Sequence, residues 1–107
     1  MNGEADDLIH QPLRLRIMAA VNGLPSNGHL EFTRLKAIVE ATDGNLGAHI
    51  TTLERAGYVV VEKDFVGKKP RTRIAATRAG RKAFAQHVAY LRDIIESASP
   101  SPHRSAS

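Results

Sequence analysis

The spacing of the apolar residues changes at Tyr58, and this change limits the possible folds more than any other feature of the sequence. Before it, apolar residues recur every three or four positions, as in Leu46, Ile50 and Leu53, which is typical of amphipathic helices. Residues 58–61 are then strand formers, and residues 71–76 alternate in the manner of a strand. After residue 77 the helical spacing returns. The sequence therefore predicts an α+β fold that is mostly α.

Capping and turn residues divide the first part of the chain into short elements. Pro12 suits the first turn of a helix, where its missing N–H has no partner in any case, and Gly23 is expected to end that helix. A very short strand is expected at residues 30–32. Thr33 then suits the N-cap of a second helix that ends near Ala41.

The second part of the chain is expected to form a helix, a hairpin and a long final helix. A turn at residues 42–44 leads into a helix at residues 44–56. Residues 66–70 supply the turn of a β-hairpin whose register the sequence leaves open. Thr77 is the expected cap of the last helix, which runs to about Ser97 and is about 30 Å long.

A chain of 107 residues allows one compact domain, which we expect to span residues 1–96. The acidic residues 1–7 are expected to be flexible, and residues 97–107, rich in Ser, Ala and Pro, to form a disordered tail. The absence of Cys excludes disulfides and thiolate chemistry. No apolar stretch approaches the roughly 20 residues of a membrane span, and the acidic start is unlike a secretory signal. We therefore expect a cytoplasmic protein without a membrane partner.

The positive charge is concentrated in one part of the chain. The formal net charge is +4, and between residues 63 and 82 only Asp64 opposes a run of basic residues, namely Lys63, Lys68, Lys69, Arg71, Arg73, Arg78, Arg81 and Lys82. Such a block is the electrostatic footprint of a nucleic-acid contact. It is equally typical of a solvated hairpin that keeps a protein in solution, so charge alone leaves both interpretations open.

Two short helices joined by the turn at residues 42–44 form a helix-turn-helix, whose second helix typically enters the DNA major groove. Its apolar stripe holds it in the core, and the side chains expected to face away are Asn45, Ala48, His49 and Thr52. Asn can pair with adenine, Thr can bond to bases or phosphates, and Ala can touch a thymine methyl group. Gly47 costs helix stability but allows close approach of the backbone.

Four segments, in chain order, resemble winged helix-turn-helix transcriptional regulators of the MarR/ArsR-like kind. Residues 10–14 are similar to the opening helix of that family, residues 41–59 to its recognition segment, residues 65–73 to its wing and residues 77–81 to the start of its final helix. The resemblance implies a winged helix-turn-helix fold with a two- or three-stranded β-wing and a long C-terminal dimerisation helix.

The resemblance also implies a function and a set of contact residues. It implies a homodimeric regulator that binds double-stranded DNA sequence-specifically, with residues 44–56 in the major groove and residues 59–76 on the backbone or in the minor groove. The implied DNA contacts are Asn45, Ala48, His49 and Thr52 in the recognition helix, and Lys68, Lys69, Arg71 and Arg73 in the wing. Because Arg71 and Arg73 are two residues apart, they share one face of a strand, where Glu62 could neutralise one of them.

The last helix carries an apolar seam, formed by Phe84, Val88, Leu91 and Ile95 at 4-3-4 spacing. This seam could simply pack against the first helix. A helix this long outruns a small domain, however, so we expect it to form a dimer interface together with Leu13 and Ile17 of the first helix. Such a dimer would bind a DNA site with two-fold symmetry and half-sites about one helical turn apart.

Other classes of function find no support in the sequence. No nucleophile elbow, phosphate-binding loop or pair of carboxylates indicates an enzyme, and no pair of His residues has the spacing of a metal site, so we expect no cofactor and no metal. Some winged helices bind proteins instead of DNA, which makes a protein-interaction module without DNA binding the alternative. A small-molecule effector between the dimer helices stays open.

Overall fold

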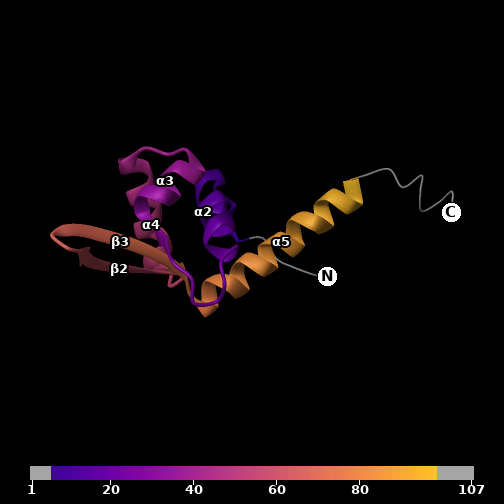
Figure 1. Ribbon diagram of the computed structural model, residues 1–107. Helices are drawn as coiled ribbons and strands as arrows, with labels where there is room; N and C mark the ends of the chain where they lie inside the picture. The colour runs from indigo at the N-terminus through magenta and orange to yellow at the C-terminus, as the bar shows by residue number, and fades with distance from the viewer. Residues whose placement is uncertain (1–5, 99–107) are drawn as a thin grey trace.

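The computed structural model describes residues 6–98, which form five helices and three strands. In chain order these are α1 (Asp7–His10), α2 (Pro12–Asn22), β1 (Leu30–Glu31), α3 (Phe32–Val39), α4 (Asp43–Arg55), β2 (Val59–Val66), β3 (Lys69–Ala76) and α5 (Arg78–Ala98). Helices α2, α3 and α4 gather into one body, from which the β2–β3 hairpin and α5 project in opposite directions (Figure 1). The predicted class, α+β and mostly α, is confirmed.

The predicted boundaries of α2 and α4 agree with the structure because local caps set them. Helix α2 begins at Pro12, and the side chain of Gln11 accepts a hydrogen bond from the backbone N–H of Arg14 at 2.8 Å. Helix α4 is capped by Thr42, whose Oγ1 accepts from the N–H of Asn45 at 3.2 Å. Gly57, just past the end of α4, has a left-handed φ of 81°, the conformation that commonly closes a helix.

The predicted start of α3 is wrong. Thr33 lies inside the helix, which begins at Phe32, and the N-cap residue Glu31 makes no side-chain capping bond. The reason is tertiary: Glu31 is paired with Arg73 as the last residue of β1, so strand and helix follow one another with no turn between them.

Both ends of the described chain are more ordered than predicted. Asp6 caps α1 through Oδ1, which accepts from the N–H groups of Leu8 and Ile9 at 3.0 and 3.1 Å, and Ile9 is fully buried. The prediction of flexibility for residues 1–7 is therefore wrong at Asp6 and Asp7, and its remainder lies outside the described residues. At the other end α5 continues to Ala98. The disordered tail was predicted to start at residue 97, which lies inside this helix, and residues 99–107 lie outside the described residues.

The sheet has three antiparallel strands in the order β1-β3-β2. Strands β2 and β3 pair from Val59↔Ala76 to Val66↔Lys69, which leaves a two-residue loop. Gly67 supplies the positive φ, 65°, at the first loop position, as a tight hairpin turn of this kind requires. The register left open by the sequence is thus settled, and the wing is the three-stranded form of the two expected.

Helix α5 is fastened to the body at its first turn. Thr77 is the predicted cap: its Oγ1 accepts from the N–H of Gly80 at 2.9 Å and donates to the carbonyl of Gly57 at 2.6 Å. Gly80 packs directly on Tyr58, since a Cβ at this position would lie 2.0 Å from the Tyr58 carbonyl oxygen. The core beneath is built mainly from α2, α3, α4 and the sheet, with Ile17, Leu35, Leu46, Leu53 and Ile74 fully buried.

Candidate nucleic-acid interface

Helix α4 has one buried face and one open face. Leu46, Ile50 and Leu53 are buried, as predicted, and at about 100° per residue the opposite side of the helix carries Ala48 and Arg55. The residues that the structure leaves exposed on α4 include Gly44, Asn45, Ala48, Thr51 and Arg55, whereas His49 and Thr52 are half-buried. Of the four predicted contact residues, Asn45 and Ala48 therefore lie fully on the open face. Thr51 and Arg55 were missed, although the angular spacing alone would have found them.

The two neighbouring threonines of α4 have their hydroxyl protons engaged within the helix. Thr51 Oγ1 donates to the carbonyl of Gly47 at 2.9 Å, and Thr52 Oγ1 donates to the carbonyl of Ala48 at 3.2 Å. Because a hydroxyl has two further lone pairs, each oxygen still offers an acceptor to a ligand on the open face.

His49 lies at the edge of α4 that faces α2. A guanidinium nitrogen of Arg14 lies 3.1 Å from His49 Nδ1, and because guanidinium groups only donate, Nδ1 must accept. The neutral ring therefore carries its proton on Nε2. Partial burial and, after it, the charge of Arg14 lower the pKa of His49, so the ring is neutral at pH 7. His49 was predicted to face away from the core, but its side chain is half-buried and contacts Arg14 of α2.

An exposed ion pair and a left-handed residue lie at the turn of the helix-turn-helix. Lys36 Nζ of α3 lies 2.8 Å from Asp43 Oδ1 at the start of α4. Glu40, which ends α3, adopts the left-handed conformation with φ 57°, so the chain turns within a few residues. This turn sets the direction in which the open face of α4 points.

Arg71 and Arg73 of the hairpin are engaged in ion pairs. Arg71 binds Asp64 with two hydrogen bonds of 2.9 and 2.7 Å, and the hydrogen bond from Arg71 is the largest cause of the lowered pKa of Asp64. Arg73 lies 3.1 Å from Glu62, the predicted partner, and 3.4 Å from Asp64. Two arginines and two carboxylates leave no net charge, so the wing owes its positive potential to its lysines.

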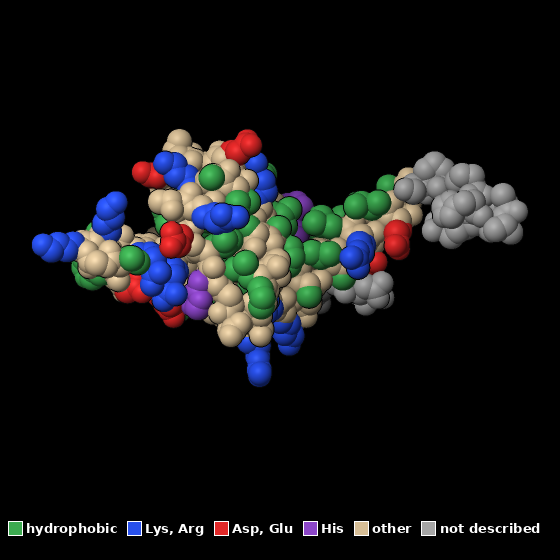
Figure 2. Space-filling view, viewed as in Figure 1, with side chains coloured by type: hydrophobic (Ala, Val, Ile, Leu, Met, Phe, Trp, Pro, Cys, Tyr) green, Lys and Arg blue, Asp and Glu red, His purple; other side chains and the backbone are tan. Residues whose placement is uncertain are grey.

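The free cations of the hairpin are Lys63, Lys68 and Lys69, for which the described residues supply no ion pair. Lys68 and Lys69 are exposed at the turn, and Figure 2 shows basic side chains at the far end of the hairpin. Lys63, which the sequence analysis did not single out as a contact, lines a groove of about 340 Å³ between α4 and the hairpin, together with Gly47, Thr51, Glu54 and Thr72. Its position depends on the hairpin register, which the sequence left open.

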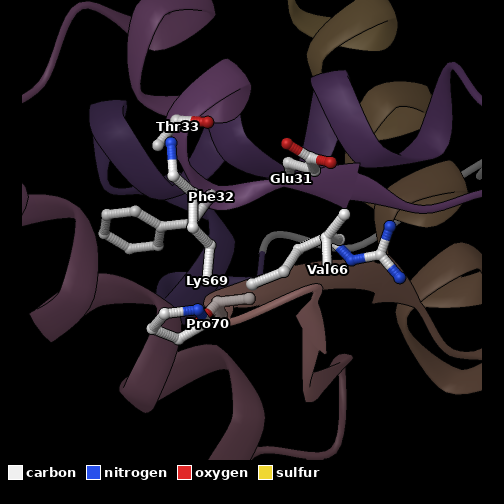
Figure 3. A pocket seen from close by; sticks show the side chains of 8 residues that line it. Glu31, Phe32, Thr33, Val66, Lys69 and Pro70 are labelled. Atoms are coloured by element: carbon white, nitrogen blue, oxygen red, sulfur yellow. The ribbon is translucent and has the colours of Figure 1, made fainter.

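A second groove, of about 400 Å³, follows the free edge of β3 beyond the end of β1. Figure 3 shows Phe32 and Thr33 on one side and Lys69 and Pro70 on the other. The basic turn of the wing therefore lies next to the start of the helix-turn-helix.

The predicted dimer residues fall into two groups. Phe84, Val88, Leu91 and Leu13 are half-buried, and Ile95 is 63% exposed. Figure 2 shows hydrophobic side chains continuing along α5 past the body of the domain. Ile17, by contrast, is 0% exposed in the single chain. Its prediction as an interface residue is wrong because α2 turns Ile17 into the core, leaving no surface for a second copy.

His87 of α5 is a buried polar residue that joins the two ends of the domain. Its Nδ1 accepts from the backbone N–H of Asp6 at 3.1 Å, and its Nε2 lies 3.2 Å from His10 Nδ1. Asp6 in turn accepts from the Tyr58 hydroxyl at 2.7 Å, and the ring of Tyr90 stacks on His87. Because a backbone N–H can only donate, neutral His87 carries its proton on Nε2 and donates to His10. Burial, followed by the neighbouring His10, lowers the pKa of His87.

The chemistry available on this surface is recognition by hydrogen bonds and charge. Within residues 6–98, no group of three or more His, Asp or Glu side chains is arranged to hold a metal ion. In that same stretch every helix is too short or too polar to cross a membrane.

The sequence profile described as winged helix DNA-binding domain matches residues 13–95. An uncharacterized protein of Methanocaldococcus jannaschii is 33% identical over 81 residues, which cover 76% of this chain and 85% of that protein. The structure of a transcriptional regulator homologue from Pyrococcus horikoshii superposes with a TM-score of 0.79 at 26% identity, over 89% of this chain and 91% of that chain.

Two further solved structures share the fold at lower identity. NadR in complex with 4-hydroxyphenylacetate has a TM-score of 0.62 at 24% identity, covering 85% of this chain and 67% of that chain. A MarR-family regulator from Silicibacter pomeroyi has a TM-score of 0.64 at 19% identity, covering 94% and 66%. With its three-stranded wing, long final helix and profile match over residues 13–95, the chain belongs to the winged helix DNA-binding domain family.

Proposed function

We propose that this protein is a homodimeric transcriptional regulator that binds double-stranded DNA sequence-specifically, with α4 in the major groove and the hairpin on the backbone or in the minor groove. The observation that carries the proposal is the open face of α4, small and polar, beside a hairpin for whose three lysines residues 6–98 supply no ion pair. A groove-binding helix needs such a face, and a phosphate backbone needs such cations.

The recognition face combines side chains of different hydrogen-bonding character. Asn45 suits adenine, Ala48 suits a thymine methyl group, and the oxygens of Thr51 and Thr52 suit base donors. His49 donates from Nε2, since Arg14 occupies Nδ1. Beyond its own helix backbone and chain neighbours, Gly47 has no neighbour among the described residues within 4 Å of an added Cβ. Packing within residues 6–98 therefore does not require a glycine there, and close approach of DNA gives the position a purpose.

The lysines of the hairpin supply affinity rather than sequence choice. Lys63, Lys68 and Lys69 neutralise phosphates and release counterions. Arg71 and Arg73 hold the hairpin in shape through Asp64 and Glu62, and they reach phosphates only by exchanging these carboxylates for DNA oxygens.

The homodimer is proposed from α5, whose apolar seam continues past the body to Ile94 and Ile95. Two copies joined there would present two α4 helices to a two-fold symmetric site, with half-sites about one helical turn apart. The Pyrococcus relative, described as a transcriptional regulator homologue, supports the regulatory role.

The first test is fluorescence anisotropy of the protein on a random-sequence duplex across a salt series. We expect micromolar-range affinity that falls steeply as salt rises. No binding even at low salt would contradict the proposal and leave a protein-interaction module in its place. Because NadR was solved with 4-hydroxyphenylacetate, a repeat with small aromatic acids tests for an effector, which a changed DNA affinity would reveal.

Base recognition needs a separate test. Binding sites are selected from a random library with the wild-type protein, with Asn45→Ala and with Thr51→Val. Each variant is expected to relax the preferred base at one position of the half-site, at a cost of about 1–3 kcal/mol there. An identical motif for all three proteins would exclude base readout by this face.

A further inference from the structure

The end of the hairpin exposes two large apolar side chains. Phe65 is 69% exposed and Val66 56% exposed, and they lie next to the loop residues that follow them. Phe65 is paired across the hairpin with Pro70, so two rigid apolar groups stand side by side. Apolar side chains that gather on an exposed surface, unlike single ones, are typical of an interaction site.

The alternation of side chains along the strand gives the direction of Phe65. Val61 and Lys63 both line the groove against α4, and Phe65 follows at the same two-residue spacing on the same face. Pro70 and Thr72 continue that face on β3. Phe65 and Pro70 therefore lie on the side of the hairpin that faces α4, beyond the groove.

The charges around this pair select the kind of surface it fits. Lys68 and Lys69 adjoin it at the turn and Lys63 stands behind it, while the nearest carboxylate, Asp64, is bound by Arg71. An apolar pair among cations that have no ion pair within residues 6–98 suits a partner with anionic walls and an apolar floor. The DNA minor groove is such a surface, since phosphates line it and separated base pairs expose apolar faces.

We propose that Phe65, supported by Pro70, inserts as an apolar wedge between base pairs in the minor groove and bends the bound DNA, an inference that rests on the function proposed above. The three lysines hold the phosphates on either side. The wedge makes the hairpin selective, because pyrimidine–purine steps unstack most easily. The protein would then prefer certain sequences at a base-pair step to which it forms no hydrogen bond.

The test compares Phe65→Ala with Phe65→Leu, which keeps an apolar wedge, and with Val60→Ala, an exposed residue of the same strand away from the hairpin end. Affinity comes from anisotropy and the bend from energy transfer between dyes at the two ends of a selected duplex. We expect Phe65→Ala to lose about 5- to 150-fold in affinity and most of the bend, with an unchanged salt slope because no charge is removed. Phe65→Leu should lose much less, and Val60→Ala nothing.

The outcomes separate this inference from the proposed function. If the wild-type protein binds no duplex, both fall. If it binds, and Phe65→Ala binds and bends as the wild type does, the wedge alone is excluded. If Phe65→Ala instead changes self-association in sedimentation without DNA, the hairpin end contacts a second copy and the wedge is again overturned. A replacement of TA by GC at the hairpin step that weakens the wild type but not Phe65→Ala would support the wedge.

Discussion

Two glycines show, at the scale of single residues, how differently one added methyl group can act. At Gly80 a Cβ would lie 2.0 Å from the carbonyl oxygen of Tyr58. At Gly47 an added Cβ would meet no described atom within 4 Å other than its chain neighbours and its own helix backbone. The close approach at Gly80 packs α5 against Tyr58, which lies between α4 and β2, and Gly47 faces open space.

We therefore expect Gly80→Ala to lower the free energy of unfolding by about 1–3 kcal/mol or more, because backbone atoms must move apart. Gly47→Ala is the matched control: it should raise stability by about 1 kcal/mol through helix propensity, while weakening DNA binding if close approach matters. Thermal denaturation by circular dichroism measures both. Equal melting temperatures for the two variants would contradict the close packing of Gly80.

Buried His87 makes stability depend on pH. Its pKa is lowered in the folded state by burial and by His10, so the unfolded chain binds more protons once the pH falls below the ordinary value of about 6.5. The stabilisation is complete above that value and is lost as the pH drops toward the folded pKa. Protonated His87 would also direct an N–H at the backbone N–H of Asp6.

Urea denaturation between pH 8 and pH 5 measures this effect. We expect the free energy of unfolding of the wild type to decrease as the pH is lowered from 8 to 5. The decrease should be smaller in His87→Gln, because the Gln side chain cannot be protonated. His49, whose pKa is lowered too, contributes in the same direction, so His49→Gln serves as the comparison. Identical slopes for wild type and His87→Gln would remove His87 as a cause.

At the scale of elements, the hairpin divides its basic residues between structure and binding. Arg71 and Arg73 are matched by Asp64 and Glu62. Lys68 and Lys69 are exposed, and no carboxylate among the described residues forms an ion pair with them. The basic run in the sequence is thus less positive, as a surface, than its residue count indicates.

We expect Lys68→Ala/Lys69→Ala to weaken binding to all duplexes and to flatten the plot of log affinity against log salt by about 0.9 for each phosphate that the variant no longer neutralises. The control Asp64→Ala/Arg71→Ala removes one charge of each sign and should leave that slope unchanged. Anisotropy titrations at several salt concentrations measure both. A larger flattening in the control than in the lysine variant would show that the arginine, and not the lysines, meets the phosphates.

At the scale of the whole molecule, α5 extends away from the body that the other helices form (Figure 1). Ile94 and Ile95 on this helix are 44% and 63% exposed. A single chain leaves these side chains in water, and a second copy would cover them.

We expect Ile94→Glu/Ile95→Glu to be monomeric in light scattering and to lose DNA affinity, because two linked half-site contacts become one. Ile38→Glu, on α3 at 52% exposure, is the matched control and should remain a dimer. The melting temperature of the wild type, but not of the double variant, should rise with protein concentration. A wild-type protein that is already monomeric would refute the dimer.

The type and order of the elements could be predicted because their signals are local. The apolar spacing around Leu46, the cap Thr42 and the left-handed Gly57 each act within a few residues, so α4 and its open residues Asn45 and Ala48 were accessible in advance. Helix α1 was not, because four residues carry no period, and its cap Asp6 is held by His87, 81 positions away.

A helix-turn-helix followed by a hairpin and a long amphipathic helix follows from the amino-acid sequence without tertiary information, because period, capping and turn chemistry are short-range properties. Which charged groups and rings remain available for binding depends instead on how the elements pack. Asp64 binds Arg71 once the strands are in register, Arg14 orients His49 once α2 meets α4, and Ile17 is withdrawn from the surface. These outcomes depend on interactions between residues far apart in the chain, which packing brings together and no local pattern specifies.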